Sequence, residues 1–127
     1  MKLKNIKFKA KQLNSGKWFE GDLVRLGNRV CIGGDHIKDG ITDVDPSTVC
    51  MFTGLKDCEG NETWEGDILQ DVDDDDIKYV VIFDVGAFLA RKEGLYTSIP
   101  LHECVGSLGN DVITYAKVVG NKFDKEK

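Results

Sequence analysis

The segment 6–11 alternates strictly between apolar and charged side chains. One set is apolar and the other is lysine: Ile6, Phe8 and Ala10 against Lys7, Lys9 and Lys11. A period of two places the two sets on opposite faces of a β-strand. Because lysines commonly protect the outermost strand of a sheet, the pattern predicts an edge strand with a charged face.

The remaining chain is a series of short apolar runs separated by turns rich in glycine, asparagine and aspartate. These turn residues adopt the backbone conformations that tight turns require, whereas β-branched and aromatic residues favour extended strands. The strands predicted from this pattern are 18–26, 29–32, 49–53, 62–64, 77–85, 87–92, 96–99 and 112–119. The strands 49–53 and 62–64 are predicted to form a hairpin through a turn at 57–61, where aspartate, glycine and asparagine adopt turn conformations or hydrogen-bond their own main chain. Residues 33–46 are predicted to form a long irregular connection, and 101–108 a helical turn or a loop.

The run 77–85 is the clearest strand, because residues 79–83 are all β-branched or aromatic. It is predicted to be central and buried on both faces. Four residues are expected to share one core: Trp64, Ile68, Val81 and Phe83.

A short motif occurs twice. Residues 19–24 read Phe-Glu-Gly-Asp-Leu-Val, and residues 64–69 read Trp-Glu-Gly-Asp-Ile-Leu, 45 positions later. We interpret the motif as a reused local device: the aromatic residue faces the core, glycine bends the backbone and aspartate bonds nearby amides. The alternative is an active site of paired carboxylates, formed by Asp22 with Asp67 or by Glu20 with Glu65. Turn chemistry explains the motif without it, and no base or metal ligand recurs beside either copy.

At 127 residues the chain suffices for one domain or for two small lobes that share a core. Its 14 glycines and 2 prolines suit many short strands joined by turns. No apolar run approaches the ~20 residues of a membrane span, and the charged first residues lack the apolar region of a secretory signal. We therefore expect a cytoplasmic protein whose four cysteines are reduced thiols.

Several segments together resemble a known family. The central ones are 44–49 (VDPSTV), 52–57 (FTGLKD), 59–60 (EG) and 65–69 (EGDIL). Others lie at 6–10 (IKFKA), 18–24 (WFEGDLV) and 118–124 (VVGNKFD), so that the match extends over nearly the whole chain. These segments resemble the YopX-like family of small phage and prophage proteins. Cys58 departs from the family, which usually has Lys or Asn at that position.

The resemblance implies a mainly β fold carried by phage genomes, hence a protein of the bacterial host's cytoplasm. It implies an N-terminal β-hairpin lobe at 1–48 and a small SH3-like barrel lobe at 49–127, packed as one compact unit. It supplies no biochemical activity that could be transferred to particular residues. The motif residues expected to shape the fold are Thr53, Gly54, Leu55, Asp57, Gly60, Trp64, Glu65, Gly66 and Asp67.

No spacing assembles a catalytic, cofactor-binding or metal site, and none is predicted. Asp71, Asp73 and Asp75 have the spacing that begins a calcium loop, but the sixth position is Asp76 instead of Gly and the twelfth is Ile82 instead of Glu. This excludes an EF-hand and leaves a solvated loop as the expectation.

The cysteines and histidines give no zinc motif, because no C-x-x-C or H-x-x-x-H spacing occurs. His102 and Cys104 could share one face of an extended segment, but no third group is evident to orient such a nucleophilic pair. The residues considered are Cys31, Cys50, Cys58, Cys104, His36 and His102.

Charge is unevenly distributed along the chain. Residues 1–50 contain nine Lys/Arg and six Asp/Glu, a net charge of +3, whereas 51–127 contain eight and sixteen, a net charge of −8. Opposite charges on one molecule favour docking within the molecule or head-to-tail assembly, and an acidic chain disfavours general nucleic-acid binding. Our first hypothesis is therefore a non-enzymatic interaction or assembly module that binds itself or a host or phage protein, and no membrane. The residues expected at such a contact are Lys7, Lys9, Lys11, Asp73, Asp74 and Asp75.

Two alternatives remain open. The first is a small metal-dependent hydrolase that uses Asp67, Asp71 and Asp73 with a divalent cation. The second is an acidic mimic of nucleic acid that occupies a host DNA-binding protein through the loop 71–76.

Overall fold

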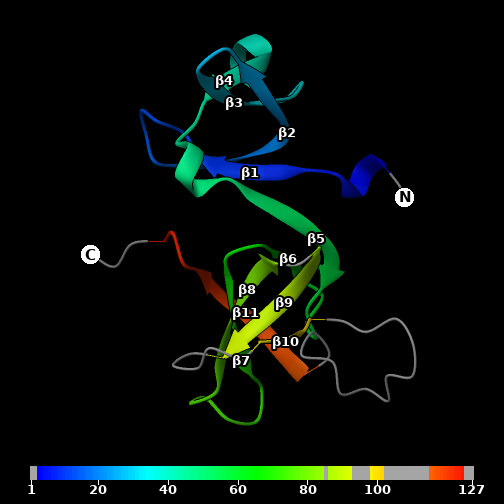
Figure 1. Ribbon diagram of the computed structural model, residues 1–127. Coiled ribbons are helices and arrows are strands. Elements are labelled where there is room, and N and C mark those ends of the chain that lie inside the picture. The colour runs from blue at the N-terminus through cyan, green and yellow to red at the C-terminus, as the bar shows by residue number, and fades with distance from the viewer. Residues whose placement is uncertain (1–2, 85, 93–97, 102–114, 125–127) are drawn as a thin grey trace. The chain divides into compact units, whose positions relative to one another are not determined.

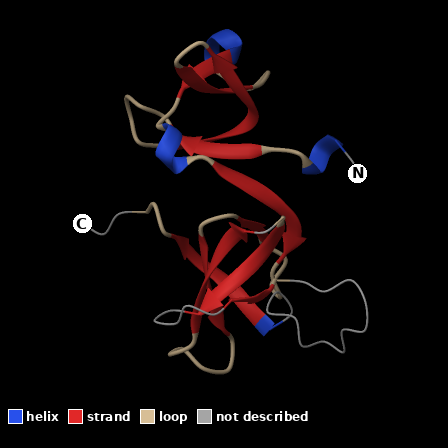
Figure 2. Cartoon of the chain, in the orientation of Figure 1, coloured by secondary structure: helices blue, strands red, loops and turns tan. Residues whose placement is uncertain are grey.

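The computed structural model describes residues 3–84, 86–92, 98–101 and 115–124 (Figure 1). Within these residues the protein is built of antiparallel strands and a few short 3-10 helices, which confirms the prediction of a mainly β protein (Figure 2). The chain divides into two compact units, Met1–Phe52 and Thr53–Lys127. In the described part of the chain, no helix has the length and apolar character needed to cross a membrane.

The first unit contains a sheet with the strand order β4-β3-β2-β1, and β5 follows β1. Its strands are β1 (Phe8–Lys11), β2 (Trp18–Leu26), β3 (Arg29–Gly33), β4 (Ile41–Asp43) and the first residues of β5 (Cys50–Lys56). Its 3-10 helices are η1 (Leu3–Asn5), η2 (Lys38–Gly40) and η3 (Pro46–Thr48). The prediction of an irregular connection over 33–46 was wrong in its middle, because β4 lies there and pairs with β3.

β1 is an inner strand of this sheet. It pairs with β2 from Phe8–Gly21 to Lys11–Trp18, and on its other side with the start of β5. The prediction of a lysine-protected edge strand was therefore wrong. Alternation determines which residues share a face of a strand, but it says nothing about the neighbours on either side.

The core of the first unit lies on the apolar face of β1. Its buried members are Ala10, Ile32, Ile37 and Val44, and the half-buried residues packed against them are Phe8, Phe19, Leu23, Val30 and Val49. A bridge between Gln12 and Val44 brings the end of β1 against the residue that follows β4. The apolar face predicted for 6–10 thus meets the core at positions 8 and 10, while Ile6 stays 42% exposed.

The second unit begins within β5, which lies beside β6 (Glu62–Trp64) as the sequence predicted. Its own sheet has the order β10-β9-β8-β7-β11, and all pairs are antiparallel. The strands are β7 (Asp67–Asp71), β8 (Lys78–Asp84), β9 (Ala87–Lys92), β10 (Ser98–Pro100) and β11 (Ala116–Asn121). Among the described residues the pairing leaves this sheet open, with β10 and β11 as its outer strands.

The core of the second unit lies on one face of this sheet. Its buried members are Leu69, Tyr79, Val81, Ala90, Leu101 and Ala116. β8 was predicted to be buried on both faces, but Tyr79 and Val81 are buried while alternate positions are half-exposed. Phe83 lies on the same face as Tyr79 and Val81, near the end of the strand. It is 49% exposed and packs edge-on against Phe88, with ring centroids 5.0 Å apart. Its predicted burial was wrong.

The other core predictions are confirmed in part. Trp64 and Val81 are buried, and Ile68 is half-buried. The predicted bounds 18–26 and 87–92 agree with β2 and β9. Parts of the strands predicted at 96–99 and 112–119 lie outside the described residues, as do residues 102–108 of the predicted helical turn or loop.

Candidate functional site

The aspartate that ends the Thr-Gly-Leu-x-Asp motif is a buried hub of hydrogen bonds. The Asp57 carboxylate accepts bonds from the amides of Glu59 (2.9 Å), Asn61 (2.8 Å) and Val118 (2.8 Å), and from Nδ2 of Asn61 (3.2 Å). Burial of the carboxylate acts to raise its pKa, but these donors outweigh it, so that the pKa of Asp57 lies below its ordinary value. Asp57 therefore shapes the turn after β5 as an ionised group and ties it to β11.

The start of the same motif forms a bend within β5. Gly54 has a φ of 83°, a conformation that residues with a Cβ rarely adopt. The hydroxyl of Thr53 donates to the carbonyl of Thr63 at 2.7 Å and accepts from the amide of Leu55 at 3.1 Å. Leu55 in turn packs against the core of the second unit. The motif thus bends the strand while its polar groups stay bonded.

Gly60 completes the turn between β5 and β6. Its φ is 86°, and its amide donates to the carbonyl of Asp57 at 3.0 Å. Glycine is the residue that adopts this backbone conformation at least cost. The predicted turn is therefore confirmed, with Asp57 and Gly60 as its organising residues.

The second Glu-Gly-Asp copy joins two distant parts of the second unit. Asp67 is 2% exposed; its Oδ2 accepts from the amide of Trp64 at 2.7 Å and its Oδ1 from Nδ2 of Asn121 at 3.0 Å. Gly66 has a φ of 88°, donates to the carbonyl of Val81 and accepts from the amide of Lys122, both at 2.8 Å. This confirms the interpretation of a glycine bend followed by an aspartate that bonds nearby amides. Glu65, which precedes Gly66, is half-buried.

The first copy has a different structure. Gly21 lies within β2 rather than in a turn, and the Asp22 side chain is exposed. A Cβ at position 21 would lie 2.3 Å from the carbonyl oxygen of Gly33, so this glycine permits a close approach of β2 and β3. The prediction of one reused device was wrong for this copy.

The three lysines of the first unit gather around aromatic rings. The Nζ of Lys9 lies 4.7 Å and that of Lys11 5.4 Å from the centre of the Trp18 ring. The Nζ of Lys7 lies 4.8 Å from the Phe52 ring and 3.7 Å from Oε1 of Glu20. Such cation–π contacts hold the ammonium groups in fixed places at one face of the sheet. We call Lys7, Lys9, Lys11 and Trp18 the basic face.

The acidic loop 71–76 connects β7 and β8. The Asp71 carboxylate accepts from the amide of Asp73 at 2.8 Å, and the Asp74 carboxylate from the amide of Asp76 at 3.0 Å. Gln70 donates to Asp75 at 3.1 Å. Residues 72–76 are exposed. The loop is thus a short arch of turns that presents negative charge to solvent, as the sequence predicted.

The hydrolase alternative required Asp67, Asp71 and Asp73 around one metal ion. Asp67 and Asp71 are the two ends of β7, four residues apart, so their Cα atoms are separated by about 13 Å. One ion cannot bind both. No group of three or more His, Cys, Asp or Glu side chains in the described part of the chain could hold a metal ion.

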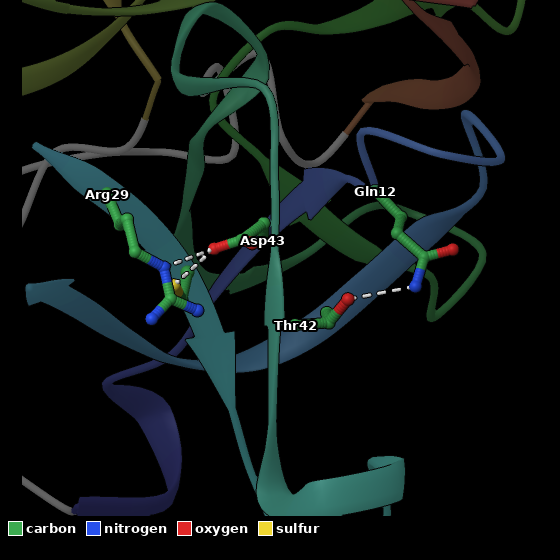
Figure 3. Close-up of polar contacts among 5 residues, drawn as sticks. Gln12, Arg29, Thr42 and Asp43 are labelled. Carbon is green, nitrogen blue, oxygen red and sulfur yellow. Dashed lines mark hydrogen bonds and ion pairs between the residues drawn. The ribbon is translucent and has the colours of Figure 1, made fainter.

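The structure also contains a polar cluster that the sequence analysis missed. Asp43 at the end of β4 accepts from Nε of Arg29 at 2.9 Å and from the thiol of Cys31 at 3.1 Å through the same oxygen (Figure 3). On the preceding residue of β4, the Thr42 hydroxyl accepts a hydrogen bond from Nε2 of Gln12 at 2.8 Å (Figure 3). Because residues 33–46 were predicted to form an irregular connection, the pairing of β4 with β3 was not predicted. The alternation of Ile41, Thr42 and Asp43 was too short to indicate a strand.

The surroundings of Cys31 favour its protonated thiol form. Burial, followed by the hydrogen bond to Asp43, raises the pKa of the Cys31 thiol. The bonds from Cys31 and then Arg29 lower the pKa of Asp43. A buried thiol that stays protonated is a poor nucleophile. Cys31 therefore serves to hold β4 against β3.

The remaining cysteine and histidine candidates do not converge within the described residues. Cys50 is buried and Cys58 is exposed. Nε2 of His36 lies 2.7 Å from the carbonyl oxygen of Glu20. His102 and Cys104 lie outside the described residues. The contact considered for these two residues is therefore not tested by the described part of the chain.

Comparison with known proteins adds one match. A family model described as YopX protein matches residues 7–126 of the chain. The match includes every motif that carried the resemblance except the first residue of the segment 6–10. No curated protein matches the sequence.

Proposed function

The chain belongs to the YopX protein family, and from this premise we propose that it is a non-enzymatic interaction or assembly module of a phage or prophage, acting in the cytoplasm of the bacterial host. The observation that carries the proposal is the opposite charge of its two units. Residues 1–52 have nine Lys/Arg and six Asp/Glu, a net charge of +3, and residues 53–127 have eight and sixteen, a net charge of −8.

The buried aspartates of the two central motifs have a structural role in this chain. The carboxylates of Asp57 and Asp67 both accept bonds from backbone amides and from an asparagine side chain. They shape turns and join strands. We therefore assign contacts with other molecules to the acidic loop, whose residues 72–76 are exposed, and to the half-buried lysines of the basic face.

We assign the contact to the basic face of one copy and the acidic loop of the next. A contact between unlike surfaces is heterologous, and repetition around an axis closes it into a ring. Exposed ion pairs contribute only ~0–1 kcal/mol each, so several must act together. Phe8 packs against the core of the first unit, while Ile6 is exposed and can add an apolar contact.

The proposal includes an SH3-like architecture for the second unit. Four strands from β7 to β10 follow one another as a meander, and β11 returns to lie beside β7. This order, β11-β7-β8-β9-β10, in which the last strand lies beside the first of a meander, supports the SH3-like part of the proposal. Closure of the barrel remains part of the proposal.

Sedimentation velocity against salt tests the assembly. We expect an oligomer at about 0.05 M salt whose population falls towards about 0.5 M, because the Debye length shortens to a few ångströms. A protein that is monomeric at every salt and protein concentration would overturn the proposal.

Charge reversal identifies the contact. Lys9→Glu with Lys11→Glu should abolish the oligomer, as should Asp73→Lys with Asp75→Lys, while the two kinds of variant mixed in equal amounts should associate again. Lys17→Glu with Lys38→Glu is the matched control, since both lysines are exposed on the same unit. Equal loss of assembly in the control would show that net charge, rather than the basic face, governs association.

A further inference from the structure

The outer edge of β11 is occupied by the chain's own turn. β11 pairs with β7 on one side, and among the described residues it is the outer strand of the sheet on the other. On that outer side, the amide of Val118 donates to Oδ2 of Asp57 at 2.8 Å, and the carbonyl of Ala116 accepts from the amide of Cys58 at 3.3 Å. One side chain and one backbone amide thus take the place of two ladder bonds from a neighbouring strand.

The turn that fills this place is itself held by Asp57. Its carboxylate accepts from the amides of Glu59 and Asn61, and its own amide donates to the carbonyl of Asn61 at 2.8 Å. Loss of the carboxylate would therefore loosen the turn and release the Val118 amide together. A free N–H on an outer strand is a template for pairing with another strand.

The strand behind this turn is complementary to itself. Residues 116–120 read Ala-Lys-Val-Val-Gly, with one charge and no proline. In an antiparallel pair centred on Val118, Lys117 of one copy lies opposite Val119 of the other, so that the lysines do not face each other. Val119 is the residue at which the register of β11 against β7 shifts by a bulge, so the regular part of such a pair is Ala116 to Val118. Val119 is 47% exposed and would be covered in such a pair.

From these observations we propose that Asp57 closes a strand-addition site: without its contact to Val118, the outer edge of β11 pairs with β11 of a second copy of the chain. This inference is independent of the charge-driven assembly proposed above. Strand pairing resists salt, because it consists of backbone hydrogen bonds and apolar contacts, whereas the charge-driven contact does not.

Sedimentation of Asp57→Ala at about 0.5 M salt tests the inference. We expect a dimer that the wild-type chain does not form under the same conditions. The variant Asp57→Ala with Val118→Pro should return to the wild-type mass, because proline removes the outward N–H and no bond to β7 is lost. A folded Asp57→Ala protein that keeps the wild-type mass would overturn the inference, and so would equal dimerisation of the proline double variant.

A second measurement covers the case in which Asp57→Ala does not fold. In the wild-type chain, hydrogen exchange of the Val118 amide should be slow, although the amide belongs to an outer strand. In Asp57→Asn the exchange of this amide should be at least tenfold faster, because one amide oxygen cannot replace both carboxylate oxygens. Unchanged exchange at Val118 in a folded Asp57→Asn protein would show that Asp57 does not guard this edge.

Discussion

The two Glu-Gly-Asp copies differ in structure although three successive residues are identical. In the second copy, Gly66 turns the chain at a φ of 88° and Asp67 is buried between the amide of Trp64 and the side chain of Asn121. In the first, Gly21 lies within β2 and Asp22 is exposed. The difference arises from residues outside the motif. Asn121 donates a hydrogen bond to Asp67 in the second copy, whereas in the first copy the carbonyl oxygen of Gly33 approaches Gly21 closely. A short motif therefore acquires its role from the strands packed beside it.

The aromatic residue that precedes each copy should give the largest contrast. Trp64 is 4% exposed, so Trp64→Ala should lower the free energy of unfolding by about 3–5 kcal/mol. Phe19 is half-buried at the core of the first unit, and Phe19→Ala should cost less, about 1–3 kcal/mol. Urea unfolding followed by circular dichroism measures both. A loss below about 1 kcal/mol for Trp64→Ala would mean that the hairpin is peripheral.

The aspartates should differ next. Asp67→Ala leaves the buried amide of Trp64 and the Asn121 side chain without this acceptor, which should cost about 2–4 kcal/mol of unfolding free energy. Asp22→Ala changes an exposed side chain and should stay within about 0.5 kcal/mol. The same urea titration is the measurement. Equal losses of unfolding free energy in the two variants would support the interpretation that both copies have the same structural role.

The glycines should both resist substitution, for different reasons. At position 66 the positive φ is the obstacle, so Gly66→Val should cost about 1–3 kcal/mol and Gly66→Asn clearly less, because asparagine tolerates this backbone. At position 21 any Cβ meets the Gly33 oxygen, so Gly21→Val and Gly21→Asn should be equally harmful. Thermal unfolding of the four variants gives the comparison, and rescue by asparagine at position 21 would contradict it.

Asp57 extends the comparison to pH. Its pKa is lower in the folded chain than the ordinary value of about 3.9. The stability it contributes is therefore fully present above the unfolded pKa and is lost as the pH falls through the folded pKa. Asp57→Asn should cost about 1–3 kcal/mol at pH 7, and the difference from wild type should shrink in acid. A difference that stays constant across urea titrations at pH 7 and at about pH 3 would assign the loss to packing rather than charge.

The smallest expected effect concerns metal. Because Asp67 and Asp71 are at opposite ends of β7, calorimetry with millimolar magnesium or manganese should give no binding heat. Saturable heat that disappears in Asp71→Asn with Asp73→Asn, but persists in Asp22→Asn, would instead favour a cation site in the acidic loop.

Local sequence predicted those parts of the fold that depend on local chemistry. The run Trp18 to Leu26 and the turn at Asp57 to Gly60 were located correctly, since strand propensity and turn chemistry act within a few residues. The inner position of β1 and the existence of β4 were missed. Both depend on which strands pair, and pairing partners such as Phe8 and Met51 are far apart in the sequence.

The hydrogen bonds of the buried polar residues were likewise predicted only where they are local in sequence. The sequence indicated that Asp57 and Asp67 bond backbone amides, because aspartate before or after a glycine turn commonly does so. It could not indicate that Val118 and Asn121 supply further donors. The Arg29–Asp43–Cys31 cluster gave no signal, because its spacing corresponds to no motif and its geometry follows from the pairing of β3 with β4.

The bonds that Asp57 and Asp67 make to β11 have a consequence for protein synthesis. Val118 follows Asp57 by 61 residues, and Asn121 follows Asp67 by 54. At ribosomal rates of about 5–20 residues per second, a nascent chain waits roughly 3–12 s between making each carboxylate and making its partner. During this interval both carboxylates remain hydrated and β7 lacks one neighbour, while all strands of the first unit have already been synthesised. We therefore expect the first unit to fold before the second, which β11 completes.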